Sequence, residues 1–135
     1  MYEIRALPAD HRLTEAARVN PGGWVYDIDF EYAPDDAVPS EAIRGAWEVS
    51  EVGVLTGGYR NNQRHRPIVQ CDRVLAPYVH ASAKFSPGKW MCEIDARGEH
   101  LFPHIPEEMI RGWWLIGEDG KITRHFRANS LYSTS

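Results

Sequence analysis

The chain has only two cysteines, Cys71 and Cys92, among its 135 residues. Small secreted domains without a large core are held together by several disulfides, so this content argues against that class. No spacing of cysteine and histidine resembles a zinc site either. We expect both cysteines to be buried free thiols rather than a bridge or a nucleophile.

Long apolar runs and a surplus of basic residues are also missing. No stretch approaches the roughly 20 apolar residues that a membrane span requires. Residues 1–5 do not show the basic region followed by an apolar one that marks a secretion signal. The formal net charge of −4 disfavours nucleic acid and anionic membranes as partners. We therefore expect a cytoplasmic protein that neither inserts into a membrane nor binds nucleic acid.

The sequence motifs of familiar catalytic and cofactor sites are absent as well. There is no glycine-rich phosphate loop, no nucleophile elbow and no helical His-Glu motif. The six histidines are scattered, and His100 and His104 share a proline-interrupted loop in one half of the chain. We expect no metal and no cofactor, and we keep these two histidines as acid–base candidates.

What the sequence does contain is one pattern that occurs twice. The nine residues PGGWVYDID return 66 positions later as PGKWMCEID, with five of nine identical. The ten residues VPSEAIRGAW return 67 positions later as IPEEMIRGWW, with six of ten identical. The identities fall on residues such as Trp, Pro, Gly and Arg, so the chain is a tandem duplication of one unit. The matched segments are 21–29 with 87–95, 38–47 with 105–114 and, more weakly, 53–62 with 120–129.

Each half shows the same predicted order of elements. Helix-like spacing of apolar residues precedes a Pro-Gly turn, an alternating strand, a single helical turn and a two-stranded hairpin. In the first half these elements occupy residues 10–19, 24–30, 38–43, 45–49 and 55–60. In the second half the helix falls within 74–85, and strands at 112–116 and 121–126 flank a turn at 117–120.

These elements predict an α+β fold with a mainly antiparallel sheet. A chain of about 60 residues buries too little surface to be stable alone. We therefore expect residues 1–135 to form a single domain made of two αβββ repeats, about 1–67 and 68–135. The repeats would pack around one core with pseudo-two-fold symmetry. Exchange of halves between two chains, giving a homodimer, is open because each half is a complete unit.

Acidic residues and an arginine recur at equivalent places in both halves. Two hypotheses account for them. Carboxylates two residues apart on a strand point to one face, where they could act as general acid or base beside an arginine that holds an anion. Alternatively, each set is an ion pair that ties two strands together. One active site needs one copy of each group, so duplication favours the structural hypothesis. The residues are Asp27, Asp29 and Arg44 in the first half, and Glu93, Asp95 and Arg111 in the second.

Four tryptophans are matched across the repeats, and we expect them in the core. They are Trp24, Trp47, Trp90 and Trp114. Trp113 is different, because the first half has Ala46 at its place, and we predict that it is an exposed anchor for a partner.

The end of the first repeat, residues 59–67, is polar and basic. It is either a solvated linker or a surface that receives an acidic partner. A binding surface predicted here combines Trp113 with Tyr59, Arg60, Arg64 and Arg66.

The order of motifs in residues 20–67 resembles a family of small actinobacterial proteins labelled type VII secretion system-associated. The likeness lies in NPGGWVYDID, then VPxExIxGAW, then YRNNxxxRP. This chain departs from the family pattern where Asn61-Asn62 replaces Asn-Pro and His65 takes the usual tyrosine position. The second copy also lacks the final Arg-Pro. The resemblance implies a partner role and supplies no catalytic residues.

Our leading hypothesis is a non-catalytic, cytoplasmic interaction protein, an accessory or chaperone-like partner in protein secretion. One alternative is a small enzyme or ligand-binding protein, of isomerase or cyclase type in secondary metabolism, with a pocket between the repeats. Its candidate residues would be the duplicated acids and arginines together with His100 and His104. Another alternative is an immunity protein that neutralises a toxin, which would have one tight partner.

Overall fold

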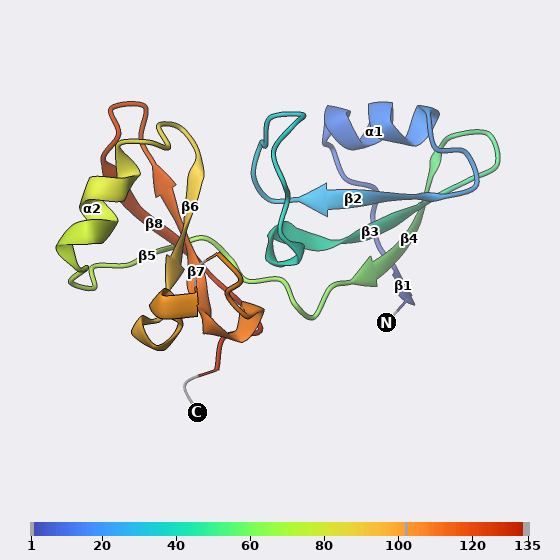
Figure 1. The fold of residues 1–135 in the computed structure, drawn as a ribbon. Helices are drawn as coiled ribbons and strands as arrows, with labels where there is room; N and C mark the ends of the chain where they lie inside the picture. The colour runs from blue at the N-terminus through green and yellow to red at the C-terminus, as the bar shows by residue number, and fades with distance from the viewer. Residues whose placement is uncertain (1, 102, 134–135) are drawn as a thin grey trace. The chain divides into compact units, whose positions relative to one another are not determined.

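A computed structural model describes residues 2–101 and 103–133, and the chain divides into two compact units (Figure 1). Unit 1 is Met1–His65 and unit 2 is Arg66–Ser135. Each unit carries one α-helix and one four-stranded antiparallel sheet among the described residues. The predicted α+β class with mainly antiparallel sheet is thus confirmed. The packing of the repeats with pseudo-two-fold symmetry as a single domain stays a prediction.

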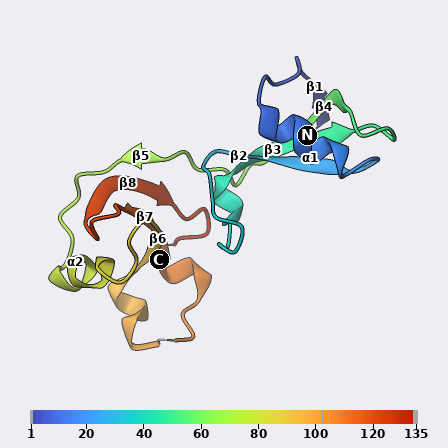
Figure 2. The same ribbon diagram turned by 90° about the horizontal axis from the view of Figure 1, so that it is seen from above.

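Unit 1 contains a sheet with strand order β1-β4-β3-β2. Helix α1 covers one face of this sheet (Figures 1 and 2), and its Leu13 and Ala17 are buried against the strands. The helix begins after Asp10, whose side chain accepts a hydrogen bond from the backbone N–H of Arg12 at 2.9 Å, as expected of an N-cap. The elements are β1 (Tyr2–Ile4), α1 (His11–Arg18), β2 (Trp24–Ile28), the 3₁₀ turn η1 (Ser40–Ala42), β3 (Ile43–Val49) and β4 (Leu55–Asn61).

Unit 2 has the same plan, with strand order β5-β8-β7-β6. Helix α2 begins at Pro77, where the missing N–H of proline does no harm. The elements are β5 (Val69–Gln70), α2 (Pro77–Ala83), β6 (Trp90–Ile94), η2 (Ala96–Leu101), η3 (Glu107–Met109), β7 (Ile110–Ile116) and β8 (Ile122–Ala128). The two hairpin strands start and end 67 positions after β3 and β4, so the sequence repeat is also a repeat of local structure. The short strands β1 and β5 were not predicted.

Both units have the same unusual backbone conformation beside the end of their first strand. Gly57 has φ 92°, and its carbonyl accepts from the N–H of Arg5 at 2.8 Å. In unit 2 the same place is taken by Arg124 with φ 73°, and its carbonyl accepts from the N–H of Cys71 at 2.9 Å. A left-handed backbone conformation is therefore present in both units, with glycine in one only.

Each unit has a core built around a buried tryptophan. In unit 1 the rings of Trp47 and Tyr59 lie 4.7 Å apart, and in unit 2 the rings of Trp114 and Phe126 lie 4.7 Å apart. The predicted burial of Trp47 and Trp114 is confirmed, since they are 4% and 0% exposed. The other buried apolar residues of these clusters are Leu13, Ala17, Val25, Val49 and Leu55 in unit 1, and Leu75, Val79, Ala83 and Ile116 in unit 2.

Two residues predicted to be buried lie on the surface instead. Trp24 is 38% exposed, because it alternates along β2 with Val25, the residue that enters the core under α1. Cys92 is exposed for the same reason on β6, while Cys71 is half-buried, and both thiols are free. Trp90 is half-buried.

No helix within residues 2–101 and 103–133 combines the length and the apolar character needed to cross a bilayer.

A glycine in the central strand of each unit allows the neighbouring ring to pack closely. A Cβ atom on Gly45 would overlap the hydroxyl of Tyr59 and lie 2.6 Å from the Arg60 carbonyl oxygen. In unit 2 a Cβ atom on Gly112 would overlap the Arg127 carbonyl oxygen. These overlaps explain why the glycine is present in both copies.

Replacing Gly45 by alanine should therefore destabilise the protein by about 1–3 kcal/mol, the usual cost of overpacking. Chemical denaturation would measure the change in the free energy of unfolding. Gly23→Ala is the matched control, because a Cβ atom there meets only the Asn20 carbonyl oxygen at 3.4 Å. Equal stability of the two variants would contradict this account of the glycine.

Candidate functional site

Each member of the first pair of duplicated carboxylates contacts a tryptophan and an arginine of its own unit. Asp27 accepts from Arg44 at 3.0 Å and from the indole N–H of Trp47 at 3.4 Å. Glu93, its counterpart, accepts from the indole N–H of Trp114 at 3.0 Å and from both terminal nitrogens of Arg73 at 2.7 and 2.5 Å. In both units the carboxylate thus joins a buried tryptophan to an arginine.

The second pair of carboxylates has a different set of partners. Asp29 lies 2.7 Å from Nε2 of His65. Asp95 accepts from the hydroxyl of Tyr132 at 2.5 Å and from the backbone and side chain of Arg97 at 2.9 and 3.1 Å. His65 and Tyr132 are 67 residues apart, so they occupy the same place in the repeat. The position that holds histidine in the first copy and tyrosine in the second is therefore a partner of the duplicated aspartate.

In unit 2, the surroundings of Glu93 and Asp95 keep these two acids ionised. Burial of Glu93 acts to raise its pKa, but hydrogen bonds from Arg73 and Trp114 outweigh burial, and the pKa is lowered. The hydrogen bond from Tyr132, followed by those from the Arg97 backbone and side chain, holds the pKa of Asp95 well below its usual range. A general acid needs a raised pKa, so the environment of these two groups favours the structural hypothesis.

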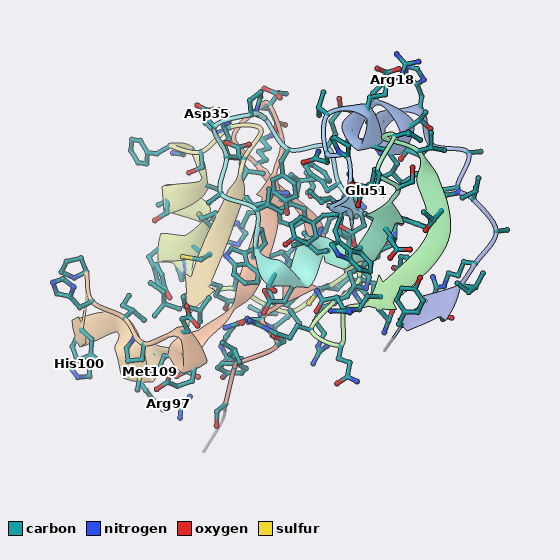
Figure 3. All side chains as sticks on the ribbon, turned by 90° about the vertical axis from the view of Figure 1, so that its right-hand side faces the viewer. Arg18, Asp35, Glu51, Arg97, His100 and Met109 are labelled. Carbon is teal, nitrogen blue, oxygen red and sulfur yellow. The ribbon has the colours of Figure 1, made fainter. Side chains whose placement is uncertain are left out.

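The remaining catalytic candidates are the two duplicated arginines and the two histidines, and each arginine contacts an acid of its own unit. Arg44 contacts Asp27, whereas Arg111 lies 3.6 Å from Asp95. His100 and His104 are both exposed, and Figure 3 shows His100 at the outer end of η2. Within the part of the chain that the structure describes, no group of three or more His, Cys, Asp or Glu residues is arranged to hold a metal ion.

The residues of the predicted binding surface are spread over both units. Tyr59 is 2% exposed and packs edge-on against Trp47 in the core of unit 1, so it cannot be a surface contact as we expected. Arg60 is exposed on β4. Arg64 contacts Glu41 at 3.5 Å. In unit 2, Trp113 is half-buried on β7, and the carbonyl of Arg66 accepts from Arg127 at 2.9 Å.

Around Arg60, unit 1 exposes aromatic side chains on the sheet face opposite α1. We call Tyr2, Trp24, Tyr26 and Arg60 the open face. The three aromatic side chains are 48%, 38% and 63% exposed, respectively. The rings of Tyr2 and Trp24 meet edge to face with centroids 6.3 Å apart, and the Arg60 guanidinium lies 5.1 Å from the centre of the Trp24 ring.

Strand pairing holds the open face in register. Tyr2 on β1 pairs with Arg60 on β4, which pairs with Ala46 on β3, which pairs with Tyr26 on β2. The hydroxyl of Tyr2 also donates to Glu48 at 3.0 Å. A shallow cavity of about 350 Å³ lies beside these residues, lined by Tyr26, Ser40, Ile43, Gly45, Ala46, Arg60, Asn61 and Asn62.

The sequence contained a signal for this surface. We missed it because we expected all four matched tryptophans to lie in the core. Along β2 the residue that enters the core is Val25, and its counterpart Met91 packs against the core of unit 2. Its neighbour Tyr26 is replaced by Cys92 in the second half, which a tightly packed position would not tolerate. The exchange of tyrosine for cysteine indicates that Tyr26 points away from the core. Trp24, two residues earlier on the same strand, then points the same way.

Comparison of the chain with protein-family models, with curated proteins and with solved structures finds no match in any of the three. What this protein does must therefore be inferred from its own residues.

Replacing Tyr132 by phenylalanine removes the hydrogen bond that contributes most to the low pKa of Asp95, so this pKa should rise while staying below its usual range because Arg97 remains. A depressed pKa in the folded state adds stability above the unfolded value of 3.8, and this stability is lost as the pH falls toward the folded value. The Tyr132→Phe variant should therefore lose part of the stability that ionised Asp95 contributes at pH values above 3.8.

The titration of the Asp95 carboxyl carbon, followed by NMR, would measure the shift. Tyr26→Phe is the control, since it removes an exposed hydroxyl elsewhere. An unchanged Asp95 titration in Tyr132→Phe would show that the tyrosine does not hold this carboxylate.

Proposed function

We propose that this chain is a non-catalytic interaction protein that binds a protein partner through the open face of unit 1. The observation that carries the proposal is the exposure of Trp24, Tyr26 and Tyr2 beside Arg60 on one rigid sheet. Trp, Tyr and Arg are the residues most enriched at the energetic centres of protein interfaces. Each large aromatic side chain brings on the order of 200 Å² of surface, so three supply the centre of an interface of about 800 Å² per partner.

The open face is ordered before any partner arrives. The edge-to-face contact of Tyr2 with Trp24, the Arg60 guanidinium over the indole and the hydrogen bond from Tyr2 to Glu48 fix these side chains. Binding then loses less side-chain entropy than it would on a surface of mobile residues. This property suits a recognition surface, because it favours affinity without any chemical step.

The resemblance to proteins associated with type VII secretion points in the same direction. Three of its motif residues, Trp24, Tyr26 and Arg60, belong to the open face. We therefore extend the proposal to an accessory or chaperone-like role in the cytoplasm for a protein bound for secretion. The immunity-protein alternative shares this surface and differs in having one tight partner.

The enzyme alternative has less support in the described residues. Of the carboxylates named for it, Asp27, Asp29, Glu93 and Asp95 each contact a side chain of their own unit. Such contacts fit carboxylates that hold strands and loops together. The experiment below separates the two hypotheses, because a bound metabolite without a protein partner would favour the enzyme.

The test is capture of the tagged protein from its native lysate, with the double variant Trp24→Ser, Arg60→Ser beside the wild type. We expect a stoichiometric protein partner with the wild type, and its loss by at least about tenfold with the variant, since each change removes a central contact. Val52→Ser is the matched control, because Val52 is an apolar residue of unit 1 that is 82% exposed away from the open face. Capture of every partner by the double variant at the wild-type level would refute the proposal.

A further inference from the structure

Unit 1 has a second concave surface, which lies beside the edge strand β2. It is a groove of about 440 Å³ between α1, β2 and the loop that follows β2. This volume falls in the usual range for pockets that bind a small group. Figure 3 labels Asp35 on this loop. We call it the acidic groove, and its lining includes Asp10, Arg12, Asp27, Phe30, Glu31, Tyr32 and Asp36.

The charges around the groove are mostly negative. Asp10, Asp27, Glu31 and Asp36 line it against a single arginine, Arg12. Internal pairing accounts for part of this charge, because Arg12 pairs with Asp10 at 3.2 Å and Arg44 pairs with Asp27 at 3.0 Å. Two of the four carboxylates are thus paired with arginine, whereas Glu31 makes no ion pair among the residues that the structure describes. A cationic group entering the groove would be attracted.

Aromatic rings form part of the same wall. The rings of Phe30 and Tyr32 lie 5.1 Å apart in an edge-to-face contact, and Tyr26 lines the groove from the edge strand. Aromatic faces bind organic cations through the ring quadrupole. Since no set of His, Cys, Asp or Glu among the described residues is placed to hold a metal, the combination favours a guanidinium or ammonium group over a metal ion.

Comparison of the two halves shows that the fold does not require this composition. At the same places in the repeat, 66 residues later, Asp10 becomes Ala76, Phe30 becomes Ala96 and Glu31 becomes Arg97. Residues that determine the fold, such as Gly45 and Trp47, recur in the second half. Asp27 recurs as the acid Glu93, but Phe30 and Glu31 of the groove are a property of unit 1 alone, as expected of residues kept for a ligand.

The position of the groove also indicates the form of its occupant. β2 is a terminal strand of its sheet, with a partner strand on one side only. Such an edge presents backbone N–H and C=O groups to an added strand, and a nearby pocket selects one of its side chains. An extended chain lying along β2 would place alternate side chains near Asp27 and Glu31.

We propose that the acidic groove and the edge of β2 bind an extended basic segment of the partner protein, with an arginine or lysine side chain in the groove. The inference rests on the proposed function, because it specifies the chemistry of that partner. It concerns a surface different from the Trp24–Arg60 contact, so each can fail while the other holds.

NMR of the full-length, ¹⁵N-labelled protein tests this with defined probes. The probes are acetyl-arginine-methylamide, a blocked hexapeptide of alternating threonine and arginine, the same hexapeptide with glutamate in place of arginine, and spermidine. We expect the two arginine probes to shift the resonances of groove residues, with a Kd on the order of 1 mM for the single amino acid and a lower Kd for the peptide. The glutamate peptide should cause no shift, and added salt should weaken binding of the arginine probes.

Glu31→Arg reproduces the charge found at this place in the second half, and it should weaken binding of both arginine probes by at least about fivefold. Glu51→Arg is the matched control, because it makes the same charge change at an exposed site in the β3–β4 turn, which Figure 3 labels. It should retain most of the affinity.

Absence of shifts with both arginine probes would overturn the inference, as would binding that Glu31→Arg leaves unchanged. Shifts at the groove with spermidine alone would identify a site for a free amine and overturn the peptide assignment. The variant Trp24→Ser, Arg60→Ser should keep the probe shifts, so the test is independent of whether the open face binds a partner.

Discussion

In each unit a buried indole N–H donates to a carboxylate on the neighbouring edge strand, and much of the remaining structure depends on this bond. The N–H of a buried tryptophan needs an acceptor, since an unsatisfied donor in the core is costly. Asp27 accepts this hydrogen bond from Trp47, and Glu93 accepts it from Trp114. A carboxylate drawn toward the core needs a cation in turn, which Arg44 and Arg73 supply from different elements. The recurrence of Asp27 as Glu93 in the sequence thus follows from the burial of the tryptophans, while the arginine comes from a different place in each unit.

Much of this architecture could be predicted from the sequence, because duplication shows which residues the fold needs. The pairing of glycine, tryptophan and carboxylate in both halves predicted the strands and their order along the chain. The strands β1 and β5 escaped prediction because two or three residues are too few to show periodicity. Tyr59 was misplaced on the surface, because the glycines before it in β4 hide the alternation that brings it to the core.

The open face and the acidic groove show why binding surfaces were harder to predict from this sequence than the fold was. Both depend on which side of β2 a residue faces, and on a loop whose course follows no repeat. Arg60 and Arg127 illustrate the point, because they match in sequence and both lie near a tryptophan ring. Yet Arg60 is exposed, whereas Arg127 is 0% exposed. Equivalent positions share a backbone environment, while their solvent exposure depends on what surrounds each copy.

The left-handed backbone conformation of Gly57 and Arg124 has a wider consequence. Gly57 adopts this conformation at little cost, whereas Arg124 adopts it at a cost of about 1 kcal/mol or more. The bend is present in unit 2 without a glycine, so the surrounding strands impose it. Each aligned pair that differs is, in the same sense, an exchange of side chains that the repeated fold accommodates. Comparison of the two halves thus shows, within one molecule, which side chains this backbone can exchange.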